Sequence, residues 1–105
     1  MILFNILKKI KAYGRLCKAI EMAENANASE GGRYYVVPTN TGKLMVLDRH
    51  SFRKLKQKGY VPKKYNIKAL ETECFYCTPY RNGKGGLTKE QIKERRENYY
   101  AHLGL

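Results

Sequence analysis

Residues 33 to 48 read RYYVVPTNTGKLMVLD, and this stretch decides the fold class. Two apolar runs of strand length, residues 34 to 37 and 44 to 47, are separated by Asn40, Thr41 and Gly42, which are typical of turns. The pattern predicts a β-hairpin. Successive side chains of a strand point to opposite faces, and both runs are apolar throughout. We therefore expect the hairpin to be covered on both sides.

A short helix is predicted directly after the hairpin, over residues 49 to 58. Asp48 can accept a hydrogen bond from a free backbone N–H of the first helical turn. Gly59 can adopt the left-handed conformation in which many helices end. Phe52 and Leu55 share one face of this helix, and we expect them to anchor it on the sheet.

The segment from residue 68 to residue 78 (KALETECFYCT) shows an alternating pattern. On a strand, Leu70, Thr72, Cys74 and Tyr76 would share one face, and the residues between them would share the other. We therefore expect a third strand over about residues 69 to 77, paired with the hairpin.

A last helix is predicted over about residues 89 to 103. Thr88 and Gln91 have the spacing of a capping box, and Gly104 marks the end of the helix. The chain of 105 residues has the length of one domain. We predict a single α+β domain, residues 1 to 105, in the order α-β-β-α-β-α, with a three-stranded, mainly antiparallel sheet covered by helices.

The first helix is predicted over about residues 2 to 26, with a length of ~37 Å at ~1.5 Å per residue, so part of it should project. An apolar stripe runs along it at alternating spacings of three and four: Leu3, Ile6, Ile10, Tyr13, Cys17 and Ile20. The stripe either packs on the sheet, pairs with a protein, or adsorbs to an anionic membrane. We favour protein contact over a membrane. Residues 24 to 32 (ENANASEGG) predict a loop that separates a helical unit, residues 1 to 28, from a core of residues 33 to 105.

The net charge of +12 is concentrated in one part of the chain. The twenty residues from 49 to 68 contain eight basic residues and no acidic one. Cations of this kind bind phosphates, and exposed aromatic rings stack on bases. The sequence therefore favours a small nucleic-acid-binding protein, for DNA or RNA. The predicted contact residues are Arg49, Arg53, Lys54, Lys56, Lys58, Tyr60, Lys63, Lys64 and Tyr65.

The competing hypothesis is a structural or interaction protein, such as a component of a phage, a virion or a mobile-element assembly. Such a protein would associate with itself or with a partner through the apolar stripe of the first helix. On this hypothesis the basic segment is a solvated surface or a contact for an acidic partner.

Cys74 and Cys77 have the spacing of many metal and redox motifs. The other candidate ligands, Cys17, His50 and His102, are scattered along the chain. On a strand, the two cysteines would lie on opposite faces about 10 Å apart, too far for a disulfide. We interpret them as buried apolar residues and expect no metal and no cofactor. Three cysteines without a signal-peptide pattern fit a reducing, cytoplasmic compartment.

The groups that could form a general acid–base site are Asp48, His50, Glu71 and Glu73. None of them belongs to a catalytic motif. Asp48 has the position of a helix cap, and the two glutamates are placed to pair with Lys43 or Arg33. We therefore expect no catalytic residues and a non-enzymatic function.

Overall fold

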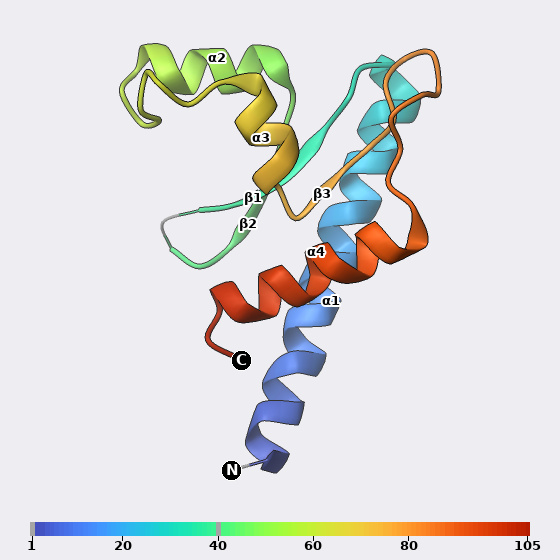
Figure 1. The fold of residues 1–105 in the computed structure, drawn as a ribbon, viewed down its shortest axis with the longest axis vertical. Coiled ribbons are helices and arrows are strands. Elements are labelled where there is room, and N and C mark those ends of the chain that lie inside the picture. The colour runs from blue at the N-terminus through green and yellow to red at the C-terminus, as the bar shows by residue number, and fades with distance from the viewer. Residues whose placement is uncertain (1, 40) are drawn as a thin grey trace.

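The computed structural model describes residues 2–39 and 41–105 and has an α+β architecture. The elements are α1 (Ile2–Glu30), β1 (Tyr35–Pro38), β2 (Leu44–Leu47), α2 (Arg49–Gln57), α3 (Ile67–Glu73), β3 (Tyr76–Cys77) and α4 (Lys89–His102), as Figure 1 shows. The three strands form one antiparallel sheet in the order β2-β1-β3. The predicted fold class and sheet are confirmed. Asn40 of the predicted turn lies outside the described residues.

The sheet separates two apolar clusters, as the two-sided hairpin pattern predicts. Val36 and its neighbours Leu44, Val46 and Tyr76 pack with α1 and α4. The strand residues that alternate with these point to the other face of the sheet, and they pack with α2 and α3; Tyr35 is one of them. Each hairpin strand therefore contributes to both clusters.

The helix α1 is longer than predicted, because it continues through the expected loop to Glu30. Its buried face is also different from the predicted apolar stripe. The buried side chains are Ala12, Leu16, Ala19 and Ala23, at spacings of four, three and four. Small side chains let the helix approach the sheet closely. Residues 4 to 11 are all exposed, and this half of α1 extends beyond the crossing with α4 (Figure 1).

The predicted strand over residues 69 to 77 is wrong over most of its length. Residues 67 to 73 form α3, and only Tyr76 and Cys77 form β3, which pairs with β1. Asn66 starts the helix by accepting a hydrogen bond from the Ala69 backbone N–H at 2.8 Å. The buried residues Leu70 and Cys74 are four positions apart, which is a helical spacing. Cys74 caps this helix, so the predicted separation of the two cysteines on opposite strand faces does not occur.

The predicted helix boundaries of α2 and α4 are close to the observed ones. The Asp48 carboxylate accepts a hydrogen bond from the Ser51 backbone N–H at 2.8 Å. Thr88 and Gln91 form the complete capping box. Gly59 follows the end of α2 with a positive φ of 85°. These local signals are confirmed.

Candidate nucleic-acid interface

Helix α2 holds the first part of the basic segment in a defined orientation. Phe52, only 3% exposed, packs into the cluster beneath the helix, and Leu55 packs against the same cluster. This leaves Arg53 and Lys54 exposed on the outer side. Lys56 is half-buried, with its Nζ 5.7 Å from the centre of the Phe52 ring. The basic residues in the last turn, Lys54 and Lys56, lie at the negative end of the helix dipole, and their charges therefore stabilise the helix.

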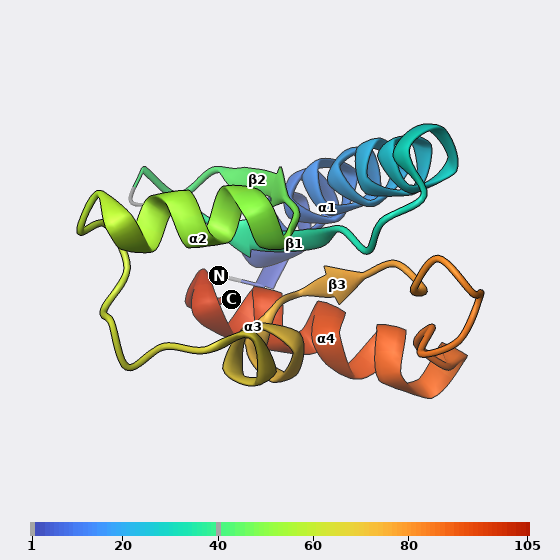
Figure 2. The ribbon, with the colours of Figure 1, turned by 90° about the horizontal axis from the view of Figure 1, so that it is seen from above.

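The second part of the basic segment is the connection between α2 and α3, residues 58 to 66. Figures 1 and 2 show this connection at the periphery of the molecule. Lys58, Lys63 and Lys64 on it are exposed. The ion pairs among the described residues involve Arg33 and Arg49, both with Glu71. The exposed cations of the connection therefore have no carboxylate partner in this part of the chain.

Arg49 has different surroundings from the other basic residues. Its Nη2 donates to the Glu71 carboxylate at 3.4 Å. The same carboxylate accepts hydrogen bonds from the hydroxyls of Tyr35 and Tyr80 and lies 4.0 Å from Arg33. Although burial opposes it, the Tyr80 hydrogen bond and the Arg33 charge hold the pKa of Glu71 below its usual value. Arg49 is thus already paired with a neighbouring carboxylate, which it shares with Arg33.

The two tyrosines of the basic segment differ in accessibility. Tyr60 is 74% exposed. Tyr65 is half-buried, with its ring centre 6.2 Å from that of Phe52, and its hydroxyl donates to the Glu73 carboxylate. Tyr60 is therefore the ring that is free to stack on a ligand, whereas Tyr65 belongs to the packing of α2 against α3.

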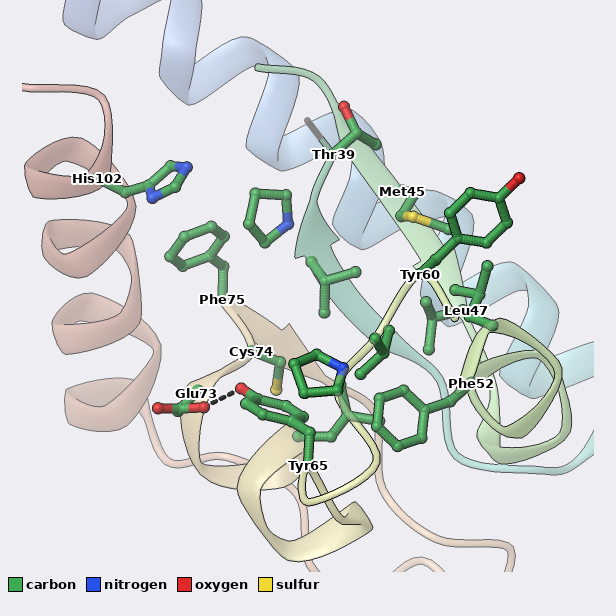
Figure 3. A pocket seen from close by; sticks show the side chains of 16 residues that line it. Thr39, Met45, Leu47, Phe52, Tyr60, Tyr65, Glu73, Cys74, Phe75 and His102 are labelled. Carbon is green, nitrogen blue, oxygen red and sulfur yellow. Dashed lines mark hydrogen bonds between the residues drawn. The ribbon is translucent and has the colours of Figure 1, made fainter. Parts of the chain in front are cut away.

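A largely apolar cavity of about 880 Å³ lies beside the basic segment. Met45, Leu47, Phe52 and Phe75 are among its lining residues, with Glu73 and His102 at one side (Figure 3). Tyr60 also contributes to its wall. The cavity therefore adjoins the exposed ring and the cationic connection.

The predicted interaction stripe of α1 is only partly used by the fold. Ile6, Ile10 and Tyr13 are 47%, 62% and 46% exposed. Cys17 is exposed, and Ile20 is half-buried against the cluster around α1. The side chain of Leu3 lies outside those that the structure describes. Most of the described stripe thus remains free for a partner.

The groups considered for acid–base chemistry have separate surroundings. The backbone hydrogen bond from Ser51 lowers the pKa of Asp48, which caps α2. His50 is exposed on α2. Glu71 lies among arginines, and Glu73 binds Tyr65. Each glutamate therefore has its own partners, and the predicted contact between Arg33 and Glu71 is present, although Glu71 lies on a helix and not on a strand.

A polar cluster around Cys74 and Cys77 was not predicted from the sequence. Arg33 Nη2 lies 2.9 Å from Cys77 Sγ, and Arg95 Nη1 lies 3.2 Å from Cys74 Sγ. The only sequence signal for this cluster was the Cys-x-x-Cys spacing, and the predicted strand geometry argued against a disulfide between the two cysteines.

Comparisons of the chain with protein-family models, with curated proteins and with solved structures found no match. Among the described residues, histidines, cysteines and carboxylates are nowhere gathered in groups of three or more that could hold a metal ion. Within residues 2–39 and 41–105, no helix combines the length and apolar character needed to cross a membrane.

Proposed function

We propose that this protein is a small, non-enzymatic nucleic-acid-binding protein that acts in the cytoplasm. One observation carries the proposal: five exposed cations on α2 and the following connection have no acidic neighbour in the segment. They are Arg53, Lys54, Lys58, Lys63 and Lys64. A row of unpaired cations attracts a phosphate backbone and releases its counterions. Tyr60 beside them offers a face for a base.

Salt dependence is the test of this proposal. If about five phosphates are neutralised, the logarithm of the association constant should fall with the logarithm of salt with a slope of about −4.5 on duplex DNA and about −3.5 on a single strand. Fluorescence anisotropy with labelled duplex and single-stranded oligonucleotides at several KCl concentrations measures both slopes. Tyr60→Ala should weaken binding to single strands more than binding to duplexes, because only unpaired bases can stack on the ring.

Charge reversal at the proposed interface needs a control of equal net charge. Arg53→Glu/Lys58→Glu/Lys63→Glu changes the interface. Lys84→Glu/Lys89→Glu/Lys93→Glu changes exposed residues elsewhere. Each variant replaces three basic residues by glutamate, and each replacement lowers the charge by two. The net charge therefore falls from +12 to +6 in both variants. We expect the first variant to lose binding and the second to retain most of it. Equal losses in both variants would show that net charge, and not this surface, governs binding.

The exposed stripe of α1 favours a second candidate function. We propose, as the alternative, a structural or interaction protein that associates through Ile6, Ile10 and Tyr13. Phe4 and Leu7, 61% and 51% exposed, extend this apolar surface. Contiguous exposed apolar surface usually marks an interface. A phage or mobile-element assembly is the context that we expect for such a protein.

Light scattering on the full chain and on Ile6→Asp/Ile10→Asp tests this alternative. Both substituted residues are exposed, so the variant should fold. A parent dimer that becomes a monomer in the variant would support self-association. A monomer in both cases would contradict self-association.

A further inference from the structure

Cys74 and Cys77 form a buried pair at the junction of α3 and β3. Their exposed fractions are 2% and 1%. Because α3 ends at Glu73 and the chain then turns into β3, the two cysteine side chains lie in one apolar cluster, where the Cys74 thiol donates to the Glu71 backbone carbonyl at 3.6 Å. Cys74 is the cap of α3. The two cysteines therefore do not lie on opposite faces of a strand, and both sulfurs belong to the same buried cluster.

A buried arginine is directed at this pair. The Arg33 side chain is only 8% exposed. Its Nη2 lies 2.9 Å from Cys77 Sγ, closer than the 4.0 Å between its Nη1 and the Glu71 carboxylate. Its Nε is buried without a hydrogen-bond partner among the described residues. The same Nη2 also donates to the uncharged Gly85 carbonyl at 2.8 Å. A buried cation needs a compensating negative charge, and the Cys77 sulfur can supply one in addition to the Glu71 carboxylate.

The charges around the pair are unbalanced without a thiolate. Arg33 and Arg49 share one carboxylate, that of Glu71. Arg95 adds a third guanidinium, which donates to the backbone carbonyls of Glu71 and Cys74 at 3.0 and 2.7 Å. The Glu71 carboxylate thus pairs with two of the three guanidiniums, and Arg95 has no carboxylate within 4.0 Å among the described residues. A thiolate at Cys77 supplies a second negative charge.

The acid–base properties of the two thiols agree with this geometry. The hydrogen bond from Cys74 and the hydrogen bond and charge of Arg33 outweigh burial and hold the pKa of Cys77 well below its usual value. The hydrogen bond to Cys77 and burial raise the pKa of Cys74. Of the other groups near the pair, the charge of Arg95 also favours the Cys77 thiolate.

A route from solvent leads to the pair. Cys74 lines the cavity of about 880 Å³ beside the basic segment. Figure 3 shows its sulfur among the residues of the cavity wall, near Tyr65. A molecule as small as a peroxide can therefore reach Cys74 from the cavity, and Cys77 lies in the same cluster.

We propose that Cys74 and Cys77 are a redox-responsive dithiol that peroxides oxidise to a disulfide. The Cys77 thiolate attacks one peroxide oxygen, the O–O bond breaks, and hydroxide leaves, so that Cys77 becomes a sulfenic acid. The Cys74 sulfur then attacks the Cys77 sulfur, the S–O bond breaks, and the hydroxyl leaves as water with the Cys74 proton. Two sulfurs have lost two electrons in total, and the peroxide has accepted them. Oxidation removes the anion that compensates Arg33.

The first test is the ultraviolet absorbance of the thiolate as a function of pH. It is made in a Cys17→Ser background, which removes the exposed thiol. We expect one thiolate to be present in the folded protein at neutral pH, where an ordinary thiol with a pKa of about 8.5 is mostly protonated. Hydrogen peroxide should then remove two thiols, and mass spectrometry should find an intramolecular disulfide between Cys74 and Cys77. No thiolate at neutral pH, or a disulfide only after unfolding, would overturn the proposal.

Variants separate the roles of the two cysteines and the arginine. In Cys74→Ser, peroxide should leave a sulfenic acid at Cys77 that a dimedone probe traps. Arg33→Gln should raise the pKa of Cys77 and slow oxidation at neutral pH by about tenfold or more, because a thiol that returns toward the ordinary pKa of about 8.5 is only a few per cent thiolate at pH 7. Arg96→Gln is the matched control, because Arg96 lies over the Tyr13 ring and not at the sulfurs. If Arg33→Gln fails to fold, the parent titration still decides the proposal.

Discussion

Gly14 and Gly59 show how one residue type has opposite effects in two backbone conformations. An added Cβ would meet nothing within 4 Å at either position. Gly14 lies inside α1, whereas Gly59 has a φ of +85° after α2. Alanine is favoured over glycine in a helix interior and disfavoured in the left-handed region.

We therefore predict that Gly14→Ala stabilises the protein by about 1 kcal/mol and that Gly59→Ala destabilises it by about 1 kcal/mol. Urea unfolding followed by circular dichroism measures both changes. A stabilising Gly59→Ala would contradict the left-handed conformation at the end of α2. A destabilising Gly14→Ala would show that this position has a partner.

The carboxyl group of Glu71 makes the free energy of unfolding depend on pH. The folded-state pKa of its carboxyl is lowered, so its contribution is present above the unfolded pKa of about 4.3 and is lost as the pH falls through the lower folded value. Asp48 adds an effect of the same sign. We predict that Glu71→Gln lowers stability at neutral pH and flattens the loss between about pH 5 and the acid range. Urea unfolding at a series of pH values measures this. If Glu71→Gln loses stability with falling pH as steeply as the parent, Glu71 is not the source of the pH dependence.

At the scale of the elements, the buried face of α1 is the feature most open to test. Ala23 is fully buried, whereas the neighbouring Met22 is 56% exposed. We predict that Ala23→Leu costs about 1–3 kcal/mol because the added atoms have no space against the sheet. The control Met22→Leu should change stability by less than about 0.5 kcal/mol. Thermal or urea unfolding compares them. Similar stabilities for the two variants would argue that another face of α1 packs on the core.

The helix α3 shows why short elements are hard to predict. The stretch from residue 68 to residue 73 has an alternating pattern, which is typical of a strand, and it also contains good helix formers. Over so few residues the sequence is compatible with both a strand and a helix. Asn66 decides the outcome locally by capping the helix. Burial of Leu70 and Cys74 against the sheet then selects the helical spacing. The alternating pattern over these six residues therefore did not indicate a strand.

At the scale of the whole molecule, the net charge of +12 opposes compaction. Added salt screens this repulsion, since the Debye length falls to about 10 Å at 0.1 M. We predict that the thermal unfolding midpoint rises as KCl is added from a low concentration. The rise should be smaller in Lys84→Glu/Lys89→Glu/Lys93→Glu, whose net charge is lower. A midpoint that falls with KCl would indicate that favourable ion pairs dominate.

The features that the sequence predicted well depend on neighbours a few positions away. The hairpin, the Asp48 cap, the capping box of Thr88 and Gln91, and the end of α2 at Gly59 are of this kind. The basic segment was also visible, because charge clustering is a property of composition. For such features the controlling contacts lie within one turn of helix or one turn of a hairpin.

The tertiary structure alone decided the features that depend on residues distant along the chain. Two apolar stripes compete on α1, and the position of the sheet selects the alanine face because a close approach needs small side chains. Tyr60 and Tyr65 look alike in sequence, but only Tyr65 meets Phe52. Arg33, which precedes β1, and Arg95, on α4, lie far apart along the chain, yet both contact the cysteine pair. The physical reason is common to all three: a side chain's surroundings are set by packing between elements, which no local pattern encodes.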